Sequence, residues 1–384
     1  MVTKRLRVLS VTKSTGGLAF YNRDLCKRLD REKFDLHVLC LSENNEKYAA
    51  EMRALGVTAY TMEMNRYAID PLSDLRLARQ IVKLIREGNF DVTIGHGSKA
   101  GFLVRLAERL TGVPAIYALA TMSFVPRIHG KKAYAYRIIE KFGSLLGGHI
   151  ATVAYSNKDQ LLKYGIVPEN RATVIQNCID LERFNGSGDP MRAKESLKLD
   201  PNRPVIGWAA RFMPQKAPLD FIRAAAKVVA SVPDVQIFMA GEGEFAPEVD
   251  AFIKEHQLQN NVTRAVWQAD VVLMLKAFDI YVSSSHWEGL PLSVLEAMAM
   301  GCATVATAVD GTREVIEHGK TGYLVEAGAI DDLAHQIIDL LNNPIQRRQI
   351  AAAGQQHIRS HFGIQKMINE WETIISQIAT AASK

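Results

Sequence analysis

The sequence contains few of the residues and patterns that mark metal sites, disulfide frameworks and membrane spans. Its four cysteines are scattered over 384 residues, with no C-x-x-C pair and no histidines at metal-ligand spacing. This pattern argues against a zinc site or a disulfide framework and favours a reducing compartment. No G-x-G-x-x-G follows the first predicted strand, which argues against a dinucleotide dehydrogenase. No apolar run is long enough to cross a bilayer.

The order of the predicted elements indicates two α/β domains, and the length of the chain is more than one core accommodates comfortably. Strand-like β-branched runs alternate with helical patterns from residue 6 onwards, as in parallel sheets covered on both faces. The most linker-like stretch is "NGSGDP", after which the alternation restarts at "PVIGWAAR". We expect Rossmann-like, doubly wound domains over 1–183 and 184–363 that face each other across a cleft, with a C-terminal helix over 364–384 that packs back on the first.

A basic segment between Val125 and Gly165 carries as much net charge as the whole chain, which is formally +5. Within it, "KKAYAYRIIEKFGSLLG" predicts a helix with apolar residues at spacings of four, four and three (Tyr134, Ile138, Phe142, Leu145). Core packing and a solvated basic face are one interpretation. Contact with an anionic membrane surface is the other.

Two positions in the sequence suit an anion. Arg211 and Lys216 follow a predicted strand within a short loop, and together they suit a diphosphate, because Arg can bind phosphate oxygens bidentately and Lys acts as a point charge. Gly16 and Gly17 lie between the first strand and the first helix, where a backbone can approach a phosphate. Each signal alone is weak, since ordinary loops use the same residues.

The stretch "HWEGLPLSVLEAMAMG" places Glu288 before a predicted helix and Glu296 inside it. Pro291 suits the first turn, so the amides of Leu292 and Ser293 are expected to face an anion. A carboxylate accepts two hydrogen bonds at once, which suits a vicinal diol. A nucleotide-sugar has a diphosphate between two sets of hydroxyls. The cationic side chains Arg211 and Lys216 would therefore bind the phosphates, and the two glutamates would bind the diols.

These motifs resemble those of one family nearly from end to end. "EGLPLSVLE" resembles the E-x7-E signature of retaining glycosyltransferases of the two-Rossmann GT-B fold, family 4. "ARFMPQKAP" is similar to the G-R-x4-K-G element of that family, with Ala210 and Ala217 in place of glycines. "STGG", "IQNCIDLERF" and "DGTREVIEHGKTGYLV" resemble further elements in the expected order.

The resemblance implies roles for particular residues. Arg211 and Lys216 would stabilise the departing diphosphate, Glu288 would contact the donor sugar and Glu296 the ribose. Further substrate contacts would come from the two glycine-containing loops, the start of the helix and the region around the nucleotide base (Gly16, Gly17, Gly289, Leu290, Pro291, Leu292, Ser293, Trp267, Gln268). The family needs no metal, the sequence has no D-x-D motif to ligate one, and we expect no cofactor.

The sequence departs from the family at one position. Relatives commonly carry a histidine just after the fifth strand, where this chain has Ala120. His96, at the end of the preceding predicted strand, is the nearest candidate substitute for a substrate contact. A lone histidine at a strand end is as often a structural hydrogen-bonding residue.

The expected activity is the transfer of a sugar, with retained configuration, from a nucleotide-diphospho-sugar to an acceptor hydroxyl. We favour a UDP-sugar donor and a glycan or lipid-linked acceptor in glycolipid, lipopolysaccharide or exopolysaccharide assembly. The alternatives are a nucleotide-sugar epimerase or hydrolase on the same fold, and a catalytically silent nucleotide-sugar-binding protein. We expect a cytoplasmic location, peripheral on the inner face of the membrane where the acceptor is lipid-linked, and no nucleic-acid partner.

Overall fold

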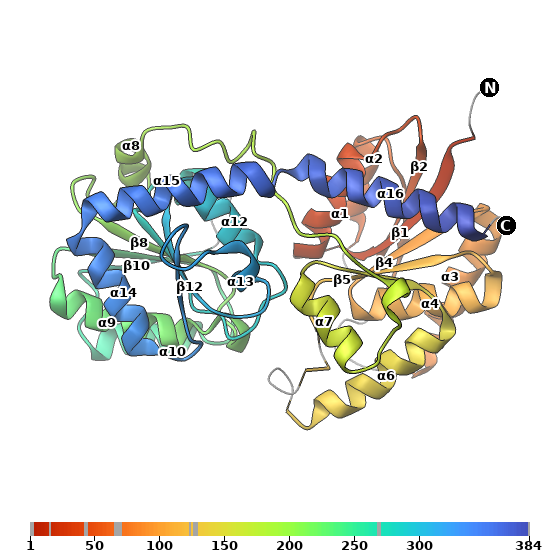
Figure 1. The fold of residues 1–384 in the computed structure, drawn as a ribbon, viewed down its shortest axis with the longest axis horizontal. Helices are drawn as coiled ribbons and strands as arrows, with labels where there is room; N and C mark the ends of the chain where they lie inside the picture. Colours follow the sequence, from red (N-terminus) through yellow and green to blue (C-terminus); the bar gives the residue numbers. More distant parts are fainter. Residues whose placement is uncertain are drawn as a thin grey trace. The chain divides into compact units, whose positions relative to one another are not determined.

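The computed structural model describes residues 4–14, 17–41, 45–64, 71–122, 124–125, 130–266 and 270–382. The chain forms two compact units (Figure 1), one comprising Met1–Gln176 with Gln365–Lys384 and the other Asn177–Ile364. Each unit contains a parallel sheet with helices on its faces. The prediction of two Rossmann-like, doubly wound units is therefore confirmed.

The sheet of the first unit has seven strands in the order β3-β2-β1-β4-β5-β6-β7. Its strands are β1 Leu6–Lys13, β2 Phe34–Leu41, β3 Thr58–Met62, β4 Val92–His96, β5 Ala115–Leu119, β6 His149–Thr152 and β7 Ala172–Val174. Its helices are α1 Gly17–Arg28, α2 Glu46–Ala54, α3 Pro71–Gly88, α4 Ser98–Thr111, α6 Lys132–Leu146, α7 Tyr155–Lys163, the 3-10 helix η1 Glu169–Arg171 and the C-terminal α16 Ile364–Ala382.

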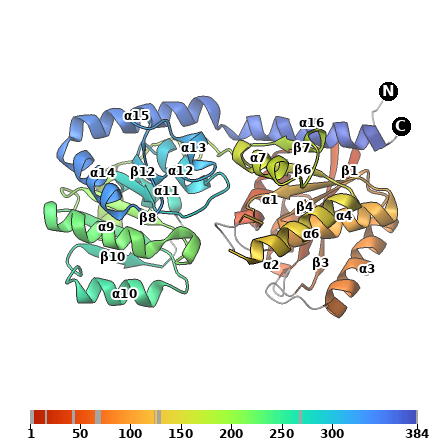
Figure 2. The ribbon, with the colours of Figure 1, turned by 60° about the horizontal axis from the view of Figure 1, so that its bottom comes forward.

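One core cluster of the first unit lies between the sheet and helices α3 and α4 (Figure 2). Leu9 and Val11 of β1 pack there with Ile81 of α3 and Val104 of α4. These strand residues are buried, which explains why the sequence reads as continuous apolar runs rather than as alternation.

Helix α16 belongs to the first unit although it ends the chain. The indole Nε1 of Trp371 donates a 2.6 Å hydrogen bond to the Tyr21 hydroxyl of α1. Glu372 binds Lys33 Nζ at 2.9 Å and accepts a 3.0 Å hydrogen bond from the backbone N–H of Asp30. These contacts attach the last helix to the first part of the chain.

The sheet of the second unit has six strands in the order β10-β9-β8-β11-β12-β13. Its strands are β8 Val205–Ala209, β9 Gln236–Ala240, β10 Val262–Ala265, β11 Ile280–Ser283, β12 Ala303–Thr307 and β13 Tyr323–Val325. Its helices are α8 Pro190–Ser196, η2 Pro214–Lys216, α9 Pro218–Ser231, α10 Ala246–Glu255, α11 Val271–Lys276, α12 Leu292–Ala299, α13 Thr312–Val315, α14 Ile330–Asn342 and α15 Pro344–His361.

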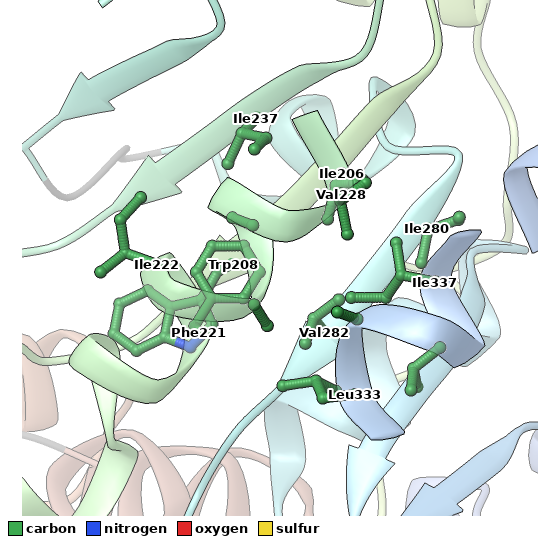
Figure 3. Packing of buried hydrophobic residues seen from close by; sticks show 14 of the residues in the cluster. Ile206, Trp208, Phe221, Ile222, Val228, Ile237, Ile280, Val282, Leu333 and Ile337 are labelled. Atoms are coloured by element: carbon green, nitrogen blue, oxygen red, sulfur yellow. The ribbon is translucent and has the colours of Figure 1, made fainter. Parts of the chain in front are cut away.

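The core of the second unit packs the central strands against α9 and α14 (Figure 3). Trp208 of β8 stacks on Phe221 of α9 with ring centroids 6.0 Å apart. Leu333 and Ile337 of α14 complete the same cluster. This packing fixes β8 and β11, the strands whose ends carry the predicted anion-binding residues.

The segment that follows the division between the units packs on the second unit. The side-chain amide of Asn177 donates a 2.7 Å hydrogen bond to the Leu290 carbonyl, and Ile179 forms a bridge with Gly363. The linker-like stretch 185–190 is also held there, because Lys276 Nζ donates to the Gly186 carbonyl at 2.5 Å. Asp189 caps α8 by accepting from the Met191 N–H at 2.9 Å. The stretch thus supplies a turn and a helix cap within one unit.

Helix α6 is held in the first unit by a buried ion pair. Arg105 Nη2 of α4 lies 2.9 Å from Glu140 Oε2 of α6, and the two side chains are 1% and 6% exposed. The Tyr117 hydroxyl donates to the other carboxylate oxygen at 3.2 Å, and the guanidinium lies 4.6 Å from the centre of the Tyr117 ring. A Cβ on Gly143 would lie 2.6 Å from Arg105, so the glycine allows the close approach of the two helices.

Arg105→Met should strongly destabilise the protein, because it leaves Glu140 buried without its cation. Breaking such a pair costs about 3–5 kcal/mol, which for a unit of this size lowers the thermal midpoint by roughly 10 °C. The double variant Arg105→Met/Glu140→Met should be more stable than the single variant, since no charge is then stranded. Thermal unfolding followed by circular dichroism measures both, and a single variant within 2 °C of wild type would contradict the assignment.

Candidate functional site

Three adjacent strands of the second unit end at the same edge of the sheet and carry polar residues there. Strands β8, β11 and β12 are parallel neighbours. The loop after β8 contains Arg211 and Lys216, the loop after β11 contains Glu288, and Asp310 follows β12. Ligands of open parallel sheets bind at such carboxyl ends.

Lys216 and Glu288 form the central ion pair of this edge. Lys216 Nζ lies 2.5 Å from Glu288 Oε1, and the side chains are 19% and 6% exposed. Burial of a lone carboxylate is unfavourable, so Glu288 requires its cation. The ammonium has three N–H groups, so this bond leaves two for another acceptor.

Three further residues fix the orientation of Glu288. The Ser285 hydroxyl donates to Oε1 at 2.6 Å, and Gln215 Nε2 approaches Oε2 at 3.5 Å while donating to the Trp287 carbonyl at 3.1 Å. The backbone N–H of Glu288 donates to Asp310 Oδ2 at 3.3 Å. Both carboxylate oxygens are therefore engaged.

Ser284 connects the loop after β11 to the loop after β8. Its hydroxyl lies 2.9 Å from the Lys216 carbonyl and 3.0 Å from the Ala217 carbonyl, and it accepts a 3.0 Å hydrogen bond from Trp208 Nε1. Ala217 has φ +46° and ψ +56°, in the left-handed region. A glycine would adopt this conformation without strain, which explains the glycine that the family usually has here.

Arg211 differs from Lys216 in its surroundings. It lies two residues after the end of β8 at Ala209, and it is exposed. Among the described residues, no carboxylate lies within ion-pairing distance of its guanidinium. The edge thus presents one paired and partly exposed cation and one exposed cation.

Helix α12 begins beside the ion pair. Pro291 is its N-cap, one position before the first helical turn in which the sequence placed it. The first intrahelical bonds run from Val294 and Leu295 to the Pro291 carbonyl, so Leu292 and Ser293 occupy the positions whose amides have no acceptor within a helix. The preceding turn is held by Gly311, which donates its N–H to the Gly289 carbonyl at 2.9 Å. Leu290 is buried, with its carbonyl bound by Asn177.

Glu296 lies on the second turn of α12 and is half-buried. Burial raises the pKa of Tyr281 on β11, the Ser293 hydroxyl bonded to it lowers that pKa, and the charges of Glu296 and Glu288 raise it. Tyr281 therefore stays neutral. The second unit thus brings together Arg211, Lys216, Glu288, Glu296 and the start of α12.

Several other predicted site residues lie elsewhere. Gly17 begins α1 in the first unit and is exposed, with no atom within 4 Å of where a Cβ would be. An approach of a ligand to its backbone is therefore sterically open. Gly16, Trp267 and Gln268 lie outside the described residues.

His96 lies in the interior of the first unit, where its side chain is almost completely buried. Its Nε2 lies 3.0 Å from the Ser10 hydroxyl, which in turn donates to Asn22 Oδ1 at 2.5 Å. Asn22 then donates to the Tyr48 hydroxyl at 3.0 Å. Burial lowers the pKa of His96 to about 4, so the imidazole is neutral. This network favours the structural interpretation of His96 over substrate contact.

Sequence reasoning did not identify Ser285 and Asp310, which position Glu288. Ser285 stands three residues before the glutamate within a serine run, and that spacing alone is not diagnostic. Asp310 had a usable signal, because the family motif usually has a glycine there. Its φ of +32° explains the glycine, and Asp is among the residues that tolerate this region.

The described residues contain no group of three or more His, Cys, Asp or Glu side chains arranged to hold a metal ion. In the part of the chain that the structure describes, no helix is long and apolar enough to cross a membrane.

Comparisons with known proteins match this architecture across the chain. The family model "Glycosyltransferase Family 4" matches residues 15–183, and "Glycosyl transferases group 1" matches residues 191–357. An Escherichia coli UDP-Gal:alpha-D-GlcNAc-diphosphoundecaprenol alpha-1,3-galactosyltransferase is 26% identical over 83% of this chain and 82% of its own length. The Staphylococcus aureus capsular polysaccharide biosynthesis glycosyltransferase CapM is 25% identical over 90% of each chain.

Among solved structures, that of Anabaena Alr3699/HepE in complex with UDP superimposes with a TM-score of 0.82 at 19% identity, covering 97% of this chain and 100% of HepE. The two Rossmann-like units thus have the GT-B fold. The chain belongs to glycosyltransferase family 4, with the group 1 glycosyl transferase domain as its second half. It is a transferase that uses a nucleotide-sugar.

His96→Ala should lower stability without weakening nucleotide binding, because His96 is buried in a hydrogen-bond network. The lost hydrogen bond and the cavity together amount to about 2–3 kcal/mol. Thermal unfolding measures the first effect, and titration calorimetry with UDP the second. His335→Ala, an exposed histidine of α14, is the matched control. A large loss of UDP affinity with an intact fold would instead place His96 in the binding site.

Proposed function

We propose that the protein transfers a sugar from a UDP-sugar to an acceptor hydroxyl with retention of configuration. The observation that supports this proposal is that the exposed Arg211 and the Lys216–Glu288 pair lie on the loops that follow two adjacent parallel strands. UDP is favoured because the E. coli relative is named for a UDP-sugar and the HepE structure contains UDP.

In this proposal the diphosphate binds between the two cations and the start of α12. Arg211 binds phosphate oxygens bidentately, and Lys216 donates its two remaining N–H groups. The amides of Leu292 and Ser293 add donors at the positive end of the helix. Together these groups stabilise the charge that develops on the leaving UDP, the dominant contribution in many such transfers.

The carboxylates bind hydroxyl groups on either side of the diphosphate. Glu288, held in place by Lys216 and Ser285, accepts hydrogen bonds from the donor sugar. Glu296 accepts them from the ribose, and the nucleotide base lies near Trp267 and Gln268. Gly289, Leu290 and Pro291 form the turn that passes the sugar.

Retention proceeds on one face of the sugar in this proposal. The bond from C1 to the diphosphate oxygen breaks, the acceptor oxygen bonds to C1 on the same face, and a leaving phosphate oxygen takes the acceptor proton. A double displacement needs a free carboxylate nucleophile. Glu288 is poorly suited to that role because Lys216 and Ser285 both bind its Oε1.

The acceptor is a glycan or lipid-linked glycan of glycolipid, lipopolysaccharide or exopolysaccharide assembly. Support comes from the names of the relatives, which include a diphosphoundecaprenol galactosyltransferase and a capsular polysaccharide enzyme. An acceptor of this kind implies a cytoplasmic protein attached peripherally to the inner face of the membrane.

UDP should raise the thermal midpoint more than GDP or ADP does, with or without EDTA. Binding at a concentration one hundred times Kd stabilises the folded state by about 2.7 kcal/mol. Differential scanning fluorimetry with each nucleotide measures this effect. No stabilisation by UDP, or stabilisation that EDTA abolishes, would contradict the proposed donor or its metal-free binding.

Arg211→Ala and Lys216→Ala should each lower kcat by on the order of 100-fold, because each removes a charge that stabilises the leaving group. Glu296→Ala should mainly raise KM for the donor, because ribose contacts are similar in the ground and transition states. UDP release from a UDP-sugar with and without acceptor measures these effects and detects hydrolysis or epimerisation. Arg223→Ala on α9 is the control and should retain activity. A fall in kcat alone in Glu296→Ala would refute the ribose contact.

A further inference from the structure

Helix α6 of the first unit turns its apolar side outwards. Leu145 is 82% exposed, Tyr134 69%, and Ile138, Ile139 and Phe142 are each about half exposed. Phe142 also stacks on Phe102 of α4, the helix beside α6 in Figure 2, and this contact extends the apolar surface to the neighbouring helix. Contiguous apolar surface of this kind marks an interaction site, whereas single exposed apolar residues are ordinary.

Helix α6 has small or polar residues at its buried positions, and its Tyr136 packs partly buried against the core. Its buried residues are Ala133, Glu140, Gly143 and Ser144, none of them a large apolar residue. Glu140 is compensated by Arg105 and Tyr117 rather than by solvent. Core packing therefore does not explain the apolar stripe that the sequence shows at helical spacing.

Lysines surround the apolar surface. Lys131 at the N-cap of α6, Lys132 and Lys141 within the helix, and Lys163 of α7 are exposed. The only carboxylate in α6 is Glu140, which is buried. Arg137, which the sequence pattern grouped with these cations, instead stacks over the Tyr164 ring at 3.8 Å and donates to the Phe124 carbonyl. Arg127 lies outside the described residues.

We propose that this surface, formed by Tyr134, Ile138, Ile139, Phe142 and Leu145 with Lys131, Lys132, Lys141 and Lys163, docks on an anionic lipid bilayer. The aromatic and aliphatic side chains suit the boundary between headgroups and acyl chains, and the lysines alongside them suit anionic headgroups. The positive charge around the surface favours a bilayer over a second copy of the same chain, whose lysines would repel. Docking itself does not depend on the proposed function. Only the access to a lipid-linked acceptor that docking would give rests on that function.

Flotation with vesicles tests the proposal directly. Wild type should bind vesicles of phosphatidylcholine mixed with phosphatidylglycerol at low salt, and should bind phosphatidylcholine alone much more weakly. Each lysine near an anionic surface strengthens binding roughly fivefold, so Lys131→Gln/Lys132→Gln/Lys141→Gln should weaken it on the order of 100-fold. Ile138→Ser/Phe142→Ser/Leu145→Ser should weaken it by a similar or larger factor.

Matched variants on the second unit control for general charge and hydrophobicity. Lys227→Gln/Lys254→Gln/Lys320→Gln removes three exposed lysines, and Ile345→Ser removes an exposed isoleucine. Both should bind vesicles as wild type does. UDP titration of every variant separates the two proposals, since the α6 variants should bind UDP with unchanged affinity.

Two outcomes would overturn the docking proposal. One is the absence of flotation with anionic vesicles at low salt while UDP still binds. The other is a concentration-dependent dimer, seen by sedimentation, that the serine variants abolish, because a second copy would then cover the surface. Failure of wild type to bind UDP would instead refute the proposed donor site and leave the vesicle result standing.

Discussion

The ion pair between Lys216 and Glu288 is the interaction on which the candidate site depends. It joins the loop after β8 to the loop after β11, and it places a cation against a buried carboxylate. Ser284 and Ser285 support it from the same short segment, one by binding the backbone of Lys216 and the other by binding the carboxylate. A site assembled in this way has its charges in place before any ligand arrives, which is the requirement for electrostatic stabilisation of a leaving group.

Much of this arrangement could be predicted from the sequence because it follows from chain order. Continuous β-branched runs predicted parallel strands, and parallel strands bring their ends to one edge, so Arg211, Lys216 and Glu288 were expected to lie together. The pairing of Lys216 with Glu288 could not be predicted in the same way, because the two residues are 72 positions apart and their contact depends on loop conformation. The left-handed backbone conformations of Ala217 and Asp310 could not be predicted in this way either. In the sequence they show only as residues at positions where the family usually has a glycine.

Side-chain direction was the other quantity that the sequence could not supply. The sequence pattern of α6 predicted an apolar stripe but not which side of the helix faces the core. In the structure the stripe faces outwards, because Glu140 on the opposite side pairs with the buried Arg105. Arg137 turns inwards for a related reason, since the Tyr164 ring and a backbone carbonyl satisfy its guanidinium. Both outcomes depend on partners contributed by other helices and loops.

The same rule, that a buried charge needs a partner, therefore has two different consequences in this chain. Arg105 and Glu140 are both sealed from solvent, so their pair positions a helix and presents nothing to a ligand. Lys216 remains partly exposed beside the buried Glu288, so its remaining N–H groups can bind an anion while the carboxylate holds the ammonium in place. The difference in exposure between the two cations, rather than the presence of an ion pair, separates a structural charge pair from one suited to bind a ligand.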